Sequence, residues 1–213
     1  MTKENLIIGI DASRNRSGGA INYLIGILNH LQPLNHGISE IHVWTPLEVA
    51  NQLPNKDWLK VHSPDSLKGK IYRQLMWQAF TLPKELKFYK CDILFTSDAS
   101  SMCTFKPSVV FSQDLLAYED GMIKSYGFSL KTIRLILILF MQNFSFRRAQ
   151  GVIFLTEYAA RIIQNKCGSI SNKIIIPHGV DDEFKNNVSL IKWPDKNKEI
   201  ICLYISQIDN YKN

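Results

Sequence analysis

Short apolar runs rich in β-branched residues alternate with helically spaced segments along most of this 213-residue chain. In residues 19–31, apolar side chains recur three and four positions apart, which is helical spacing. Parallel strands need crossover connections, so this alternation predicts an α/β fold with a doubly wound parallel sheet. The expected strands are residues 6–12, 41–44, 58–62, 92–96, 108–112, 152–155 and 173–176, and the expected helices are residues 19–31, 66–89 with a break near Pro83, 130–149 and 157–166.

A polar segment after these elements predicts a domain boundary. Residues 181–199 are rich in charged and amide side chains and contain Pro194, which is typical of a linker. Residues 200–206 then form another apolar run, as expected for a strand. We therefore expect an N-terminal domain over residues 1–180, a linker over 181–199, and the first strand of a second domain within 200–213.

Composition and charge narrow the classes of protein that remain. Hydrophobic residues make up 46% of the chain, so a packed core is expected and wholesale disorder is not. The net charge of +6 favours an anionic partner, such as a phosphorylated sugar donor or a membrane surface. A nucleic-acid role is disfavoured, because the 25 basic residues are spread along the chain and form no known reading motif.

The cysteines and the longest apolar runs indicate in which cellular compartment the protein is expected. No two of the four cysteines form a C-x-x-C pair, which argues against a zinc cage or a disulfide framework and suits a reducing cytoplasm. The N-terminal apolar run is too short for a signal peptide, and residues 133–141 are too short to span a bilayer. We expect a cytoplasmic protein that is soluble or peripheral to the membrane.

The stretch DASRNRSGGAINYL joins the first expected strand to the first expected helix. Gly18 and Gly19 allow the backbone to approach a ligand closely, and a helix N-terminus offers N–H groups to an anion. Arg14 and Arg16 add positive charge nearby. The pattern is neither G-x-G-x-x-G nor the Walker sequence, so the alternatives are an anion site of another kind or simply a tight turn.

Polar residues follow three later strands, where side chains of a doubly wound sheet enter a ligand cleft. Gln113 and Asp114 come directly after residues 108–112, although Asp114 can equally cap a turn. Glu157 begins a helix behind Thr156, a plausible N-cap, and a ligand contact is the second interpretation. His178 follows the last strand in IPHGV, where it is either structural or a ligand contact.

The segment KTIRLILILFMQNFSFRR is apolar on most faces of the expected helix. Such a helix is usually buried, and we favour burial here. The alternative is a peripheral membrane contact helped by the basic residues, including Arg147 and Arg148.

In order along the chain, these motifs resemble the N-terminal half of a family 4 glycosyltransferase with the GT-B architecture. The resemblance covers almost the whole chain and is strongest where SFRRAQGVIFLTEYAA is followed by IPHGV. It is carried by SGGAINYL, SQDLLAYED, SFRRAQGVIFLTEYAARII, IIIPHGV and LYISQIDNYKN.

The resemblance implies two Rossmann-like domains that face each other across a cleft. The N-terminal domain would bind a glycan or lipid-linked acceptor, and the C-terminal domain would bind a nucleotide-sugar donor. Transfer of the hexosyl type would usually retain anomeric configuration, without a metal or another cofactor, as in polysaccharide biosynthesis at the inner face of the membrane. The glycine-rich loop of such a domain approaches the donor diphosphate, a role that falls here on Gly18 and Gly19.

The resemblance also implies the remaining site residues, with two departures from the family pattern. Gln113-Asp114 stands where many members have His-Asp beside the reacting sugar, and a glutamine can hydrogen-bond but cannot act as a base. In the second domain, Gln207 replaces a phosphate-binding arginine, whereas Lys212 keeps the lysine. The acceptor would meet Arg14, Arg16, Glu157 and His178.

Three hypotheses follow. The first is the acceptor-side half of a sugar transferase, which is expected to be inactive alone because it lacks the donor pocket. The second is a stand-alone Rossmann-like module that binds a nucleotide or sugar phosphate without catalysis. The third is a peripheral membrane adaptor.

Overall fold

The computed structural model describes residues 5–16 and 18–179. The chain divides into two compact units, Met1–Ile176 and Pro177–Asn213, and the described helices and strands belong to the first. The expected linker over 181–199 and the expected strand within 200–213 lie outside the described residues, so these boundaries stay predictions.

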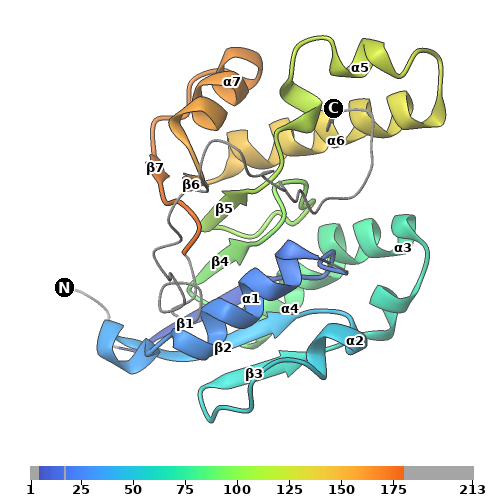
Figure 1. Cartoon of the computed structure of the whole chain (residues 1–213). Helices are drawn as coiled ribbons and strands as arrows, with labels where there is room; N and C mark the ends of the chain where they lie inside the picture. Colours follow the sequence, from blue (N-terminus) through green and yellow to red (C-terminus); the bar gives the residue numbers. More distant parts are fainter. Residues whose placement is uncertain (1–4, 17, 180–213) are drawn as a thin grey trace, which may run out of the picture. The chain divides into compact units, whose positions relative to one another are not determined.

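The first unit is built on a parallel sheet of seven strands in the order β3-β2-β1-β4-β5-β6-β7 (Figure 1). Each neighbouring pair is parallel, with β1 at the point where the strand order reverses. The predicted doubly wound, Rossmann-like sheet is therefore confirmed. The strands are β1 (Leu6–Asp11), β2 (Ile38–Trp44), β3 (Leu59–His62), β4 (Ile93–Thr96), β5 (Ser108–Ser112), β6 (Gly151–Phe154) and β7 (Lys173–Ile175).

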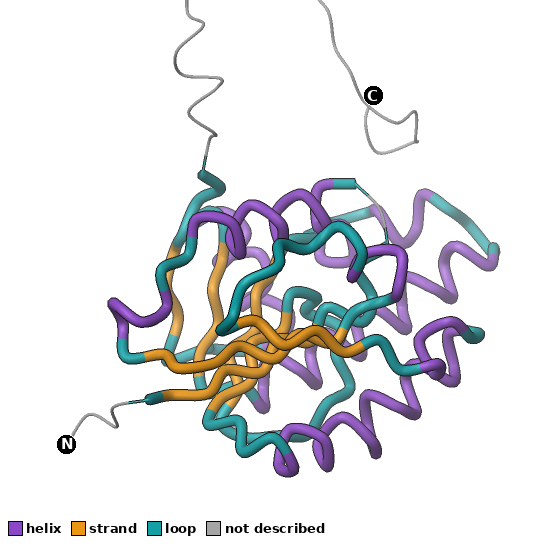
Figure 2. The backbone as a smooth tube through the Cα atoms, turned by 90° about the horizontal axis from the view of Figure 1, so that it is seen from below, coloured by secondary structure: helices purple, strands orange, loops and turns teal. Residues whose placement is uncertain are grey.

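Helices cover both faces of the sheet, which is seen between them in Figure 2. The expected break near Pro83 is wrong, because the backbone stays helical from Ile71 to Phe88. A π-helical turn over Trp77–Thr81 directly precedes the segment that contains Pro83. The helices are α1 (Gly19–His30), α2 (Leu47–Ala50), α3 (Ile71–Met76), α4 (Leu82–Phe88), α5 (Met122–Ser125), α6 (Leu130–Arg148) and α7 (Glu157–Cys167), with 3-10 turns η1 (Pro33–His36), η2 (Asp65–Lys68) and η4 (Leu116–Tyr118).

Alternate residues of β1 pack against different helices because side chains of a strand alternate between the faces of the sheet. Ile8 and Ile10 lie in a core cluster with α1. Ile7 lies in a second cluster with α4. A third cluster joins β5 and β6 to α6 and α7 around the fully buried Phe154. Because all the strands are parallel, their carboxyl ends lie at one edge of the sheet.

The expected burial of the apolar helix α6 is wrong for one of its faces. Leu135 and Phe146 are buried against the sheet, as expected. On the opposite face, however, Ile133, Leu137 and Phe140 are more than half exposed. The sequence pattern cannot separate these faces, since apolar residues occupy both.

Two histidines pair between neighbouring strands in an aromatic cluster at the β3 edge. His42 Nδ1 and His62 Nε2 are 2.9 Å apart, and His42 Nε2 lies 3.3 Å from a Glu40 carboxylate oxygen. The rings of Trp44 and Tyr89 pack against His62. Burial lowers the pKa of His62 to about 4, with a smaller contribution from the charge of His42, and burial also lowers the pKa of His42.

This pair is expected to make the free energy of unfolding depend on pH. The pKa of His62 is lower in the folded state than its ordinary value, so protons bind preferentially to the unfolded chain as the pH falls from about 6.5 to about 4. Stability is therefore expected to fall over that interval. Urea denaturation of the His62→Gln variant should show a smaller fall, whereas His36→Gln, at an exposed position, should match the unmodified chain. An unchanged pH dependence in His62→Gln would contradict this assignment.

Candidate functional site

A cluster of buried polar side chains lies where β1 and β4 end, at the carboxyl edge of the sheet. Asp11 is the last residue of β1 and is only 2% exposed. Ser13 follows it, and Ser97 and Ser101 follow β4, all of them buried. In a doubly wound sheet, ligands bind at this edge, beside the point where the strand order reverses.

The carboxylate of Asp11 is the acceptor at the centre of this cluster. Its Oδ1 accepts from the N–H of Ser13 at 3.1 Å and from the Ser13 hydroxyl at 2.6 Å. Its Oδ2 accepts from the Ser101 hydroxyl at 2.7 Å and from Gln78 Nε2 at 2.9 Å. Burial raises the pKa of Asp11, and these hydrogen bonds act against that rise. The carboxylate thus ties β1, the π-helical turn over Trp77–Thr81 and the loop after β4 into one unit.

A second set of bonds ties the loop after β1 to the loops after β4 and β5. The Ser97 hydroxyl lies 3.1 Å from both the Asp11 carbonyl and Asn15 Oδ1. Gln113 Nε2 donates to the Ser97 carbonyl at 3.2 Å. The predicted site residue Gln113 is therefore half-buried at the same edge as the glycine turn, and one of its polar groups holds the neighbouring loop.

The two arginines of the first loop have structural partners. Arg14 pairs with Asp98, with Nε 3.1 Å from Oδ2, and donates to the Ser100 hydroxyl at 3.1 Å. Arg16 is exposed and donates to the carbonyl of Leu67 in η2 at 2.8 Å. These contacts place both guanidinium groups beside the carboxyl edge. Their predicted contact with an acceptor stays a prediction.

The turn formed by Gly18 and Gly19 at the start of α1 is open, and its backbone conformation favours glycine. Gly18 has φ 66° and ψ −145°, a conformation that is essentially restricted to glycine. A Cβ atom at Gly18 or Gly19 would meet no other atom within 4 Å, so the turn faces open space. No side chain of the N-cap residue caps the helix, and its first turn contains no acidic residue. The backbone N–H groups of the first turn of α1, together with the helix dipole, favour the binding of an anion at this turn.

Asp114 and Glu157 have local roles in the structure. Asp114 is exposed, and its Oδ1 accepts from the N–H of Leu116 at 2.9 Å, which is the turn-capping role considered above. Thr156 caps α7 by accepting from the N–H of Ala159, as predicted. Glu157, in the first turn of α7, is exposed. Any contact of Asp114 or Glu157 with substrate stays a prediction.

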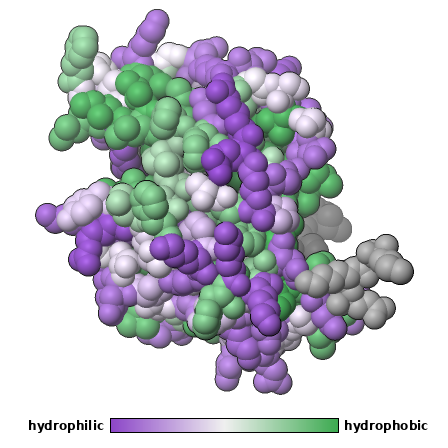
Figure 3. Space-filling model, turned by 180° about the vertical axis from the view of Figure 1, so that it is seen from behind, coloured by the Kyte–Doolittle hydropathy of each residue, from purple (hydrophilic) through white to green (hydrophobic). Residues whose placement is uncertain are grey.

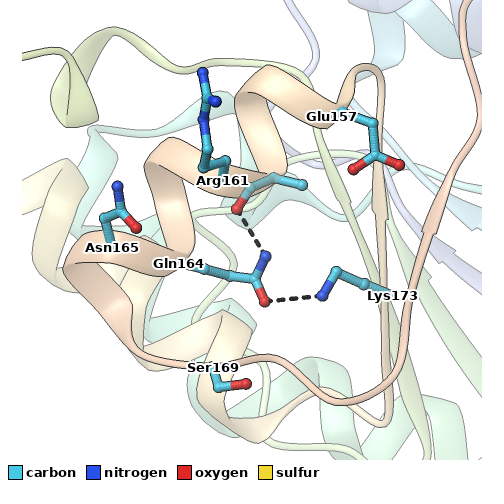
Figure 4. Close-up of a pocket in the computed structure, with 7 residues that line it drawn as sticks. Glu157, Arg161, Gln164, Asn165, Ser169 and Lys173 are labelled. Atoms are coloured by element: carbon cyan, nitrogen blue, oxygen red, sulfur yellow. Dashed lines mark hydrogen bonds between the residues drawn. The ribbon is translucent and has the colours of Figure 1, made fainter.

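Glu157 also lines an open hollow of about 390 Å³ between α7 and β7. There, Gln164 donates to the Ala160 carbonyl at 2.9 Å and accepts from Lys173 Nζ at 3.1 Å (Figure 4). The amide nitrogen and the amide oxygen of Gln164 are therefore both engaged within the protein.

Two predicted site residues are not part of this edge as described. His178 is exposed and belongs to the second compact unit. Lys212 lies outside the described residues. Within residues 5–16 and 18–179, no group of three or more histidine, cysteine, aspartate or glutamate side chains could hold a metal ion.

Sequence reasoning missed the residues at the centre of the cluster. Asp11 is the first residue of DASRNRSGGAINYL and ends the first strand, and this position was its only available signal. Gln78 could not have been found, because 67 positions separate it from its partner Asp11. Its Oε1 is buried and accepts no hydrogen bond from the described residues.

Comparisons with known proteins support the fold and give the family. Two crystal structures of Anabaena Alr3699/HepE, one in complex with UDP and one with UDP and glucose, are similar to the chain, each with a TM-score of 0.50 and 16% identity. The similarity covers 84% of this chain and 45% or 46% of the Anabaena protein, so the chain spans about half of its length. No curated protein matches significantly. The family description Glycosyltransferase Family 4 matches residues 17–184, and the chain therefore belongs to glycosyltransferase family 4.

Proposed function

We propose that this chain is the acceptor-side half of a glycosyltransferase. The whole enzyme would move a hexosyl group from a nucleotide-sugar donor to a glycan or lipid-linked acceptor. It would retain anomeric configuration and use no metal or other cofactor, and the nucleotide-sugar would be a substrate. Membership of the family supports the class of reaction.

The open glycine turn at Gly18 and Gly19 is the observation that carries this proposal. Glycosyl transfer places negative charge on the leaving diphosphate, and preorganised N–H donors at that position stabilise the transition state. The turn is aimed outward, has room for a ligand, and is held in place through the loops that Asp11 and Ser97 join. UDP bound to the structurally similar Anabaena protein makes a nucleoside diphosphate the natural probe.

The donor pocket would come from a second domain, and this limits what the described half does by itself. Transfer requires donor and acceptor to be held in register. One wall of the cleft supplies the diphosphate contact but not that alignment. The isolated chain is therefore expected to transfer no sugar, and rapid transfer by the purified chain would overturn this part of the proposal.

A nuclear magnetic resonance titration with UDP tests the site itself. We expect UDP to bind weakly and to shift the amide resonances of Gly18, Gly19 and Ala20, because those N–H groups open α1. The Gly18→Ala variant should lose these shifts, since alanine rarely adopts a positive φ. Gly37→Ala is the matched control: Gly37 also has a positive φ and open space around it, but it precedes β2 at the other edge of the sheet.

The outcomes separate the two candidate functions. Shifts confined to another region would contradict the proposed diphosphate contact. Tight, stoichiometric binding of UDP by the chain alone, without transfer, would favour the stand-alone nucleotide-binding module.

A further inference from the structure

We propose that the outward face of α6 binds the surface of an anionic membrane. This outward face consists of Phe128, Leu130, Ile133, Leu137 and Phe140. From Leu130 onward its members are spaced three or four residues apart, which aligns them along one side of the helix. Leu130 is 85% exposed, Ile133 56%, Leu137 55% and Phe140 67%. Figure 3 shows hydrophobic side chains gathered over the region of α5 and the start of α6.

Burial on the other side shows that α6 is held in this orientation. Leu135 and Phe146 pack in the core of β5 and β6, and Gln142 is also buried. The Ser129 hydroxyl accepts from the N–H of Thr132 and caps the helix. The helix therefore cannot turn its outward apolar side chains into the core without giving up the buried ones. Large exposed apolar patches on soluble domains mark interaction sites.

The charges around this face indicate which partner it fits. Residues 121–156 contain no aspartate or glutamate. The basic side chains in the same segment are Lys124, Lys131, Arg134, Arg147 and Arg148. Exposed apolar residues in a segment whose charged side chains are all basic match the interfacial region of an anionic bilayer, where acyl chains meet negatively charged head groups.

Two alternative roles for the outward face, self-association and insertion across a bilayer, are less favourable. A second copy of this chain would bring the same basic segment against itself, and like charges at an interface oppose association. Insertion across the bilayer is also disfavoured, because no helix in the described part of the chain is long and apolar enough to cross a membrane. The outward face is thus suited to lie on a membrane, with the side chains of Lys131 and Arg134 reaching the head groups.

Vesicle sedimentation with the whole chain tests this proposal, which does not rest on the proposed function. Vesicles of phosphatidylcholine alone are compared with equimolar phosphatidylcholine and phosphatidylglycerol. The chain is expected to sediment with the mixed vesicles and much less with the neutral ones. The triple variant Ile133→Ser, Leu137→Ser, Phe140→Ser should lose binding, and Lys131→Gln with Arg134→Gln should weaken it, by about fivefold for each charge.

Matched variants keep the result interpretable. Leu34→Ser with Phe88→Ser removes two side chains that are 71% and 77% exposed, from segments that precede β2 and β4 at the amino edge. This control should bind as the unmodified chain does. Circular dichroism and thermal unfolding should be unchanged in all variants, because the replaced side chains are exposed.

Three results would overturn the proposal. The first is no sedimentation with either vesicle. The second is binding that survives the triple serine variant. The third is a concentration-dependent dimer in size-exclusion chromatography that the triple variant abolishes, since this would assign the outward face to a second copy instead.

Discussion

Replacing Asp11 with leucine is expected to lower the free energy of unfolding by about 2–6 kcal/mol, because at least two buried N–H donors would each lose an acceptor at about 1–3 kcal/mol. These donors are the Ser13 N–H and Gln78 Nε2. The Ser101 hydroxyl would also lose its acceptor in a buried position. Urea denaturation at neutral pH measures the change.

The Asp11→Asn variant is the matched control, and it should lose clearly less stability. An asparagine keeps the shape and one acceptor oxygen. Its new NH₂ group can be accommodated if the Gln78 amide turns over, because Gln78 Oε1 accepts no hydrogen bond from the described residues in the present arrangement. If Asp11→Asn and Asp11→Leu lost equal stability, the hydrogen-bonding account would be wrong and packing would be the cause.

Replacing Gly9 with alanine is expected to lower the free energy of unfolding by about 1–3 kcal/mol, the range for overpacking a filled core. A Cβ atom at Gly9 would clash with Leu86 Cδ2. It would also lie 3.3 Å from Trp44 Cζ3 and 3.4 Å from Cys91 Sγ. Leu86 and Trp44 are fully buried, so α4 would have to move away from the sheet.

Gly151→Ala on β6 is the comparison for Gly9→Ala. A Cβ atom at Gly151 would meet only Val109 Cγ2, at 3.7 Å, which is ordinary contact. This variant is expected to be neutral or to gain up to about 1 kcal/mol, because alanine restricts the unfolded chain more than glycine does. Thermal unfolding of both variants decides the matter. Equal destabilisation would show that strand flexibility, rather than the close approach of α4, explains Gly9.

Much of the fold was predictable because its signals are local. Each strand is a short apolar run bounded by polar or turn residues. The start of α7 is indicated by the N-cap residue Thr156, and its helical structure by the amphipathic spacing that follows. The break expected near Pro83 was wrong, because the helix continues through a π-helical turn that the proline alone does not predict. The exposed face of α6 was not predicted, because apolar residues lie on both sides of that helix. The sequence pattern therefore does not indicate which side packs against the core.

The candidate site was predictable only in part. Gly18 and Gly19 were singled out from the sequence, where a glycine pair between a strand and a helix indicates either an anion site or a tight turn. The structure adds that this turn is open. Gln113 was found as a residue at a strand end, and the structure shows that it also holds the loop after β4. Arg14 was expected to meet substrate, yet its ion pair with Asp98, which is 84 positions further along the chain, could not be anticipated.

The sequence by itself determined the doubly wound sheet and the glycine turn, because hydrophobic period and turn chemistry act between residues close together in the chain. Its ordered motifs carried the resemblance to the family. Only the tertiary structure decided the partners of Asp11, the neutral histidine pair and the outward face of α6. Each of these depends on burial and on contacts between distant segments, and burial is a property of the packed molecule rather than of any one stretch of residues.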